Sequence, residues 1–307
     1  MKKCPFLEKC GGCKFDFTAT DYRDNKEKLI ADIPTTGAPI WTDAGNRRRA
    51  DFAFSNGKFG FFEKGTKNII PVDNCPNLTQ AINDVLPKIA RLPWCGSGAC
   101  LITECENGID VAITANVPFF TPEFKDATNK LPVIRITWND KVIKQTEKPM
   151  IAFGEKLVEY PTNAFLQPSV NSADIMRKMV QENSIGFNKI ADLFCGLGNF
   201  TFETNADGFD VVGVGTKRDL FKKPLTQGAL KQYDCVIMDP PRAGAMAQSK
   251  EIANSNVKRV IYISCNPDTF MRDKKILESG GYKNTTLIPI DQFVGSTHWE
   301  LFSVFDK

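Results

Sequence analysis

The sequence predicts an α/β protein whose second half is a Rossmann-like domain and whose first half is rich in β-strands. After Tyr160, apolar strand patterns alternate with helical patterns, as they do in a doubly wound parallel sheet. Between Pro34 and Tyr160, paired apolar runs flank tight turn sequences such as Asn56-Gly57, which indicate hairpins. Cysteines spaced like metal ligands precede both parts.

Composition excludes several classes of protein. A chain of 307 residues, 42% hydrophobic and 24% charged, is typical of a globular protein with one large or two medium domains. The net charge of +3 is too small to indicate a polyanion partner, so any nucleic-acid surface must be a local patch. No apolar run approaches the ~20 residues of a membrane span, and the start lacks the apolar core of a signal peptide. We expect a cytoplasmic protein with no membrane partner, reduced cysteines and, by default, a monomeric state.

Four cysteines are candidate ligands of one metal centre: Cys4, Cys10, Cys13 and Cys75. Two glycines precede Cys13 and permit the tight backbone that metal–sulfur bonds require. A structural zinc usually has two Cys-x2-Cys pairs, whereas iron–sulfur clusters accept irregular spacing. The single pair with a distant fourth cysteine therefore favours a cluster, with zinc and unliganded thiols as the alternatives.

The first half is predicted to contain two helices and three hairpins. Amphipathic patterns place the helices at residues 21–33 and 79–91. The hairpins turn at Asn56-Gly57, Asn107-Gly108 and Asn139-Asp140. This region is thus expected to be a β-rich domain without a parallel sheet.

Two stretches of the first hairpin each allow two interpretations. The basic run at residues 47–49 fits a solvated turn or a contact with phosphates. Phe59, Phe61 and Phe62 fit stacking on bases or, more commonly for aromatic residues on strands, packing in the core. Neither stretch establishes RNA binding.

The second half alternates helices with strands. Helices are expected at residues 169–183 and 268–278, and a closing pair of strands near residues 287–289 and 298–305. Parallel strands are expected at residues 192–194, 210–214, 235–238 and 260–264. Gly196-x-Gly198 follows the first of them and opens a helix, where free N–H groups can meet a ligand.

Candidate catalytic or binding residues follow two of these strands. Cys265 follows an apolar strand, where open α/β sheets place their reactive groups, so it is a nucleophile or a small buried residue. Asp239 ends the preceding strand and is followed by two rigid prolines, which indicates a placed carboxylate more than an ordinary turn.

Together the motifs resemble the RNA uracil-C5-methyltransferase family, which makes 5-methyluridine in tRNA and ribosomal RNA. The motifs are the cysteine lead, D-L-F-C-G-L-G-N-F, D-P-P-R-A-G, S-C-N-P-D-T-F-x-R-D and H-W-E, and they cover essentially the whole chain in the family's order. The resemblance implies a class I S-adenosylmethionine methyltransferase domain at residues 163–307. It also implies an iron–sulfur region at residues 1–34 and a β-rich RNA-binding domain at residues 35–162.

The resemblance implies a covalent mechanism. Cys265 adds to C6 of uracil, so that C5 becomes nucleophilic enough to accept the methyl group of S-adenosylmethionine. Glu300 then removes the C5 proton as a general base. His298, the single histidine, supports the site. The target base has to leave its stack to reach such a thiol.

The resemblance also implies binding residues. The S-adenosylmethionine contacts would be Gln167, Phe194, Gly196, Gly198, Asn199, Asp219 and Asp239. The ligands of a [4Fe–4S] cluster would be Cys4, Cys10, Cys13 and Cys75. The cysteine lead is typical of the ribosomal RNA branch, so ribosomal RNA is expected as the partner more than tRNA. Because the chain begins at the cysteines, we expect no N-terminal OB-type domain.

One segment departs from the family. The family has an acid after its second strand that hydrogen-bonds the cofactor ribose, and the sequence places Gly215 there. Roughly a helix and a strand are missing beyond it, although a parallel crossover needs about a dozen residues. The chain is therefore either a compact enzyme or a catalytically impaired RNA-binding homologue. An iron–sulfur redox protein would leave D-P-P-R and S-C-N-P unexplained.

Overall fold

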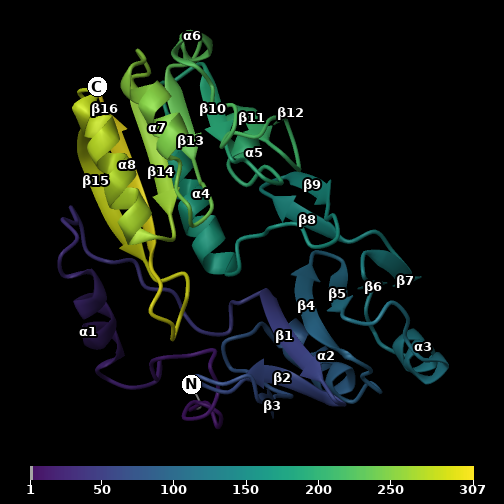
Figure 1. Cartoon of the computed structure of the whole chain (residues 1–307). Helices are drawn as coiled ribbons and strands as arrows, with labels where there is room; N and C mark the ends of the chain where they lie inside the picture. The colour runs from purple at the N-terminus through teal and green to yellow at the C-terminus, as the bar shows by residue number, and fades with distance from the viewer. Residues whose placement is uncertain (1–2) are drawn as a thin grey trace.

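Two seven-stranded sheets organise residues 3–307, which the computed structural model describes (Figure 1). The strands of the first sheet are β1 (Arg49–Ser55), β2 (Lys58–Phe62), β3 (Ile69–Pro71), β4 (Ser97–Cys105), β5 (Gly108–Ala115), β6 (Arg135–Trp138) and β7 (Lys141–Gln145). Their order across the sheet is β3-β2-β1-β4-β5-β6-β7. A separate hairpin, β8 (Met150–Phe153) and β9 (Lys156–Glu159), follows in the chain.

The three predicted hairpins are confirmed. β1 pairs with β2, β4 with β5, and β6 with β7, all antiparallel. Asn56 and Gly57 have φ of 51° and 76°, as the tight hairpin turn requires. The first half is a β-rich domain without a parallel sheet, as predicted, although one pair of its strands, β5 and β6, runs parallel. Their connection holds a helix that the sequence patterns missed, α3 (Pro122–Asn129), which Thr121 caps at its N-terminus.

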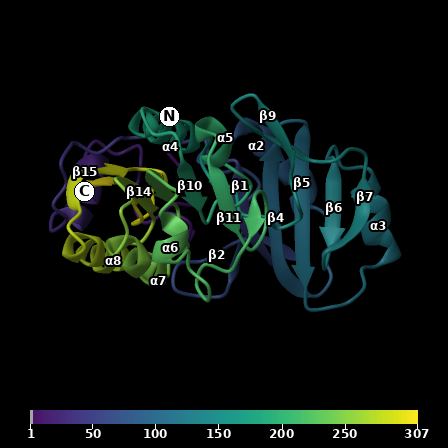
Figure 2. The same ribbon diagram turned by 90° about the horizontal axis from the view of Figure 1, so that it is seen from above.

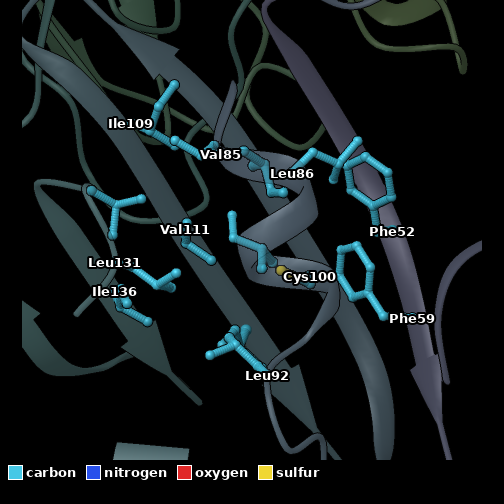
Figure 3. Packing of buried hydrophobic residues seen from close by; sticks show 14 of the residues in the cluster. Phe52, Phe59, Val85, Leu86, Leu92, Cys100, Ile109, Val111, Leu131 and Ile136 are labelled. Atoms are coloured by element: carbon cyan, nitrogen blue, oxygen red, sulfur yellow. The ribbon is translucent and has the colours of Figure 1, made fainter. Parts of the chain in front are cut away.

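The first sheet packs one face against α2 (Gln80–Ala90), which confirms the second predicted helix (Figure 3). Its residues Val85 and Leu86 are buried among apolar strand side chains. Phe52 stacks on Phe59 at 5.0 Å between ring centroids and on Phe61 at 4.4 Å. Phe59 is therefore a core residue and Phe61 packs against that core, whereas Phe62 is 48% exposed.

The second sheet has five parallel strands, one more than the sequence predicted, and the predicted antiparallel closing pair. Its strands are β10 (Ile190–Leu193), β11 (Asp207–Asp210), β12 (Thr216–Lys217), β13 (Cys235–Met238), β14 (Arg259–Ser264), β15 (Lys283–Ile290) and β16 (Glu300–Asp306). Their order is β12-β11-β10-β13-β14-β16-β15. This mixed sheet is a class I methyltransferase arrangement that places the ends of β10, β13 and β14 side by side.

Helices cover both faces of the second sheet (Figure 2). On one face lies α4 (Val170–Ser184), whose Met176 and Val180 are buried against apolar strand residues. On the other lie α7 (Met246–Ala253) and α8 (Pro267–Ser279), whose Ile252 and Phe270 are buried in a second core. The shorter helices are α5 (Thr201–Thr204) and α6 (Gln227–Leu230). The two cores fix the strand ends rigidly.

The strand predicted at residues 210–214 is wrong. β11 ends at Asp210, and residues 211–215 form an irregular link that leads directly into β12. The link is tight enough to need glycine, since a Cβ on Gly213 would lie 1.9 Å from the carbonyl oxygen of Gly196. Val211 and Val212, which made the segment look like a strand, are 53% and 63% exposed. Gly215 consequently lies in the link and not at the end of the second strand.

The N-terminal region packs on the second half of the chain. Its helix is shorter than predicted and comprises α1 (Tyr22–Glu27) and a 3-10 turn at Lys28–Ile30. Lys26 forms a fully buried ion pair with Asp291, whose Oδ2 also accepts a hydrogen bond of 2.6 Å from the Tyr22 hydroxyl. These contacts fix the segment between β15 and β16. Among the helices of residues 3–307, none combines the length and the apolar character that spanning a membrane requires.

Candidate active site

A cleft of about 720 Å³ lies at the carboxyl ends of β10, β13 and β14. Residues of the first sheet, such as Ala50 and Leu101, line it together with residues of the second. Its volume lies within the roughly 300–1,000 Å³ of small-molecule sites. Both halves of the chain therefore build one site.

The glycine turn after β10 forms one wall of the cleft. Phe194, Gly196 and Gly198 all have positive φ, of 64°, 51° and 97°. Gly198 has to be glycine, since a Cβ there would lie 2.5 Å from the Phe202 ring. A Cβ on Gly196 would instead meet nothing within 4 Å, so its backbone borders open space. The helix predicted after this turn is only the single turn of α5.

Asp210 is a cleft residue that the sequence patterns missed. It ends β11, its Oδ2 accepts a hydrogen bond of 2.9 Å from the Gly196 N–H, and its Oδ1 accepts one of 2.6 Å from the Val211 N–H. A carboxylate thus ends the second strand and ties it to the glycine turn. The sequence does show an acidic residue at the end of this strand. The valines after Asp210 extend the strand-like pattern, however, so the predicted end of the strand was four residues too late.

Aromatic and apolar groups border this half of the cleft. Asp219 lines it at a turn, where its Oδ1 accepts from the N–H groups of Phe221 and Lys222 at 3.1 and 3.2 Å. The Phe221 ring lies 5.4 Å from the Phe194 ring. Phe221 is half exposed, as are Val211 and Val212. An apolar slot with carboxylates at its edge results.

The other predicted binding residues divide between the main cleft and its surroundings. Gln167 is buried and its Nε2 donates a hydrogen bond of 2.7 Å to Asp239 Oδ2 in the cleft wall. Asn199 lines a small adjoining hollow of about 50 Å³, and its Oδ1 accepts from Arg177. Gly198 lines neither space.

The structure brings both predicted catalytic residues into the same cleft. Cys265 follows β14, and Glu300 begins the neighbouring antiparallel β16. Asp239 follows β13 on the other side of Cys265. Glu300 is almost fully buried, and its Oε2 accepts a hydrogen bond of 2.6 Å from Gln292 Nε2. Gln292 is a second site residue that no sequence pattern indicated.

Burial and mutual repulsion make these groups hard to ionise. Burial, with the charges of Glu300 and Asp239, raises the pKa of Cys265 to about 11. Burial and the Asp239 charge raise the pKa of Glu300 well above its usual range. Burial raises the pKa of Asp239 to about 7. Such shifts in one cleft are typical of groups that exchange protons with a substrate.

Arginines are among the residues that line the cleft. Arg242 follows Asp239, and its charge lowers the pKa of Cys265. Its Nη2 lies 3.2 Å from His298 Nε2, and both residues are exposed. The run at residues 47–49 is not a solvated turn, because Arg48 is buried with Glu106 at 3.3 Å, whereas Arg47 and Arg49 line the cleft.

The four N-terminal cysteines approach one another without forming a ligand set. The charge of Cys75 raises the pKa of Cys13, as do those of Cys10 and Cys4, although burial is the larger cause. Within residues 3–307, however, no group of three or more His, Cys, Asp or Glu side chains is placed to hold a metal ion. The predicted cluster therefore stays a prediction, which no metal-binding group among residues 3–307 supports.

Known proteins resemble this chain over nearly its whole length. Residues 213–306 match the family described as tRNA (Uracil-5-)-methyltransferase. An uncharacterized RNA methyltransferase of Brucella suis is 32% identical, with 99% of this chain and 84% of the relative covered. One of Agrobacterium fabrum is 30% identical, with 97% and 82% covered, over 343 positions. That alignment is longer than this chain, so the relative has residues that are missing here.

Two further similarities concern proteins with a stated reaction. The 23S rRNA (uracil(1939)-C(5))-methyltransferase RlmD of Vibrio parahaemolyticus is 26% identical, with 99% of this chain and 81% of the relative covered. The crystal structure of the tRNA (uracil-54, C5)-methyltransferase of Pyrococcus abyssi, in complex with S-adenosyl-L-homocysteine, superposes with a TM-score of 0.73. It is 20% identical and covers 93% of this chain and 82% of its own.

Proposed function

Because the chain belongs to the RNA uracil-C5-methyltransferases, which are S-adenosylmethionine-dependent enzymes, we propose that Cys265 and Glu300 carry out the methylation of uridine C5. The observation that carries this proposal is their convergence in one cleft. A thiol and a carboxyl group from neighbouring strands both line it, next to the glycine turn. The enzyme class follows from the family, and the roles below are our assignment.

In the first step the Cys265 thiolate adds to C6 of uracil. A carbon–sulfur bond forms, and the electrons of the C5=C6 double bond move towards O4, which makes C5 nucleophilic. Arg242 is a nearby positive group that favours the thiolate. In the last step the Glu300 carboxylate takes the C5 proton, the C5=C6 double bond re-forms, and the carbon–sulfur bond breaks. Two modest barriers replace one high barrier.

The residues around the glycine turn fit S-adenosylmethionine, which would supply an electrophilic methyl group. The open space at Gly196 leaves backbone free for a ligand, and Phe194 with Phe221 offers apolar surface. Within residues 3–307, Gln167 Oε1 and Asn199 Nδ2 have no hydrogen-bond partner. The family has an acid after its second strand that hydrogen-bonds the cofactor ribose, and Asp210, at the end of β11, takes that place instead of Gly215. We assign the binding role to these residues and to Asp219 and Asp239, with Gly198 shaping the turn.

Asp210→Ala is expected to weaken S-adenosylmethionine binding by about 10-fold or more, since it removes a charged hydrogen-bond acceptor from the cofactor wall. Isothermal titration of the purified protein measures this. Asp207→Ala is the matched control, because Asp207 begins the same strand, is exposed and does not line the cleft. Equal affinity in the wild type and Asp210→Ala would contradict the assignment.

The second candidate is a catalytically impaired RNA-binding homologue, which the shortened link after β11 suggested. Despite that link the chain has a cleft of about 720 Å³, and a carboxylate, Asp210, stands at the end of β11. These observations favour the enzyme. The same titration distinguishes the two, because an impaired homologue would bind no S-adenosylmethionine even as wild type.

We propose ribosomal RNA, more than tRNA, as the substrate. RlmD, which is named for a 23S rRNA uracil, resembles this chain along 99% of its length. Arg47 and Arg49 reach the cleft from the first sheet, where they can neutralise phosphates beside a flipped base. A monomeric, cytoplasmic protein remains the prediction.

We also propose that Cys4, Cys10, Cys13 and Cys75 hold a [4Fe–4S] cluster. The support is the donor set, in which a thiolate on Cys4 or Cys10 would raise the pKa of both Cys13 and Cys75. Anaerobically purified protein is expected to contain iron and sulfide at about four per chain, and Cys13→Ser is expected to lose both. Bound zinc without sulfide would contradict the assignment. The control is Cys95→Ser, which alters a cysteine outside this set.

A further inference from the structure

Gln292 is a buried polar residue without a role in the reaction described so far. It follows β15, lines the cleft and is only 4% exposed. Its Nε2 donates to Glu300 Oε2 at 2.6 Å, and its Oε1 has no hydrogen-bond partner in the part of the chain that the structure describes. Across residues 3–307, this is the side-chain hydrogen bond that reaches the Glu300 carboxyl group.

The groups that face Glu300 oppose its negative charge. Asp239 from the end of β13 repels it, and Cys265 from the end of β14 would repel it as a thiolate. Lys26, the buried cation on neighbouring α1, is already paired with Asp291. Arg242 and His298 lie together at the exposed edge of the site. The hydrogen bond from Gln292 therefore stands out as the interaction that favours the carboxylate.

Contacts with the N-terminal region of the chain hold the segment that carries Gln292 in place. Asp291, its neighbour, is fully buried and accepts hydrogen bonds from the side chains of Tyr22 and Lys26. The Asp291 N–H donates to the carbonyl oxygen of Ile40 at 2.8 Å. Beyond Gln292, the Phe293 carbonyl oxygen accepts from Lys26 Nζ at 3.0 Å. An amide held on both sides loses little entropy when it binds the carboxylate.

We propose that Gln292 is a positioning residue that favours the ionised form of the Glu300 carboxyl group and directs it at the C5 proton. This inference rests on the proposed role of Glu300. While the methylated uracil is bound to Cys265, the carboxylate must accept that proton before the carbon–sulfur bond can break. The N–H of Gln292 stabilises the Glu300 carboxylate while the methylated uracil is still bound to Cys265. Because α1 holds the segment that carries Gln292, this helix contributes to catalysis indirectly.

The test is Gln292→Met, which keeps the length of the side chain and removes the donor. Product release is expected to slow on the order of 10- to 100-fold, the range of one hydrogen bond to a charged group. Covalent enzyme–RNA adduct should accumulate on denaturing gels. Because the ionised Glu300 is the active form, activity is lost as pH falls through its pKa. Removing the donor raises that pKa, so the loss should shift to higher pH by about one unit or more.

Gln248→Met is the matched control. Gln248 is equally buried, at 1% exposed, but its amide bonds only the backbone of Leu225, outside the cleft. A release rate and pH profile of Gln292→Met equal to those of the wild type would overturn the inference. An equal fall in the release rate of Gln292→Met and Gln248→Met would also overturn it, because that result would indicate a general effect on folding. A wild type that forms neither adduct nor 5-methyluridine would defeat the proposed function first, and the inference with it.

Discussion

Cys265→Ala is expected to abolish methyl transfer, with a fall in turnover on the order of 10⁴-fold or more, because the reaction has no second route to a nucleophilic C5. Cys265 follows β14 and, among the residues that the structure describes, is the one cysteine that lines the cleft. Binding of S-adenosylmethionine should change little, since the glycine turn after β10 is untouched. A normal affinity with no turnover is therefore the expected combination.

The covalent step can be observed directly with RNA that contains 5-fluorouridine. A fluorine at C5 cannot be removed by a base, so the carbon–sulfur adduct should persist on a denaturing gel. Wild type is expected to form this adduct, whereas Cys265→Ala should form none. Cys95→Ala, which alters a thiol in the first half of the chain, serves as the control. Methylation at the wild-type rate by Cys265→Ala would contradict the mechanism.

Glu300→Gln is expected to stop the reaction after methyl transfer, not before it. Its turnover should fall about 10²–10⁴-fold, the usual contribution of a placed base. The uncharged amide retains the shape of the side chain but cannot take the C5 proton, so the methylated RNA should remain bound to Cys265. One methyl group per enzyme, found in a covalent adduct, is the expected result. Glu300→Asp should have a higher turnover than Glu300→Gln, because it keeps a carboxylate.

Two outcomes would contradict this role of Glu300. Free 5-methyluridine released at the wild-type rate would show that another group removes the proton. An absence of adduct in Glu300→Gln, with normal adduct in the wild type on 5-fluorouridine RNA, would place Glu300 in the first step. Asp239, which lies in the same cleft and has its pKa raised to about 7, would then be the next candidate base.

Local chemistry explains what the sequence could predict. The hairpins carry Asn-Gly and Asn-Asp turns whose positive φ few other residues accept, as at Asn56 and Asn139. Cys265 and Asp239 were predictable because a buried parallel strand delivers the residue after it to a fixed edge of the sheet. Their place in one cleft required the resemblance, since periodicity does not say which strands are neighbours.

The remaining features depend on long-range packing. Asp210 was missed because the exposed valines after it have a strand-like pattern, while the real constraint is the approach of Gly213 to the glycine turn. Gln292 lies in a segment without a motif and gains its role from Glu300, eight residues away, and from the buried pair Lys26–Asp291. Neither contact has a signature in local sequence.

The central claim is best tested by transfer of a tritiated methyl group from S-adenosylmethionine to unmodified total RNA. Anaerobically purified protein would be used, followed by separation of RNA fractions and nucleoside analysis. The proposal predicts label in 5-methyluridine, in the ribosomal RNA fraction, despite the shortened link at residues 211–215. Protein that binds RNA but transfers no label would contradict it, and would identify the chain as an impaired homologue.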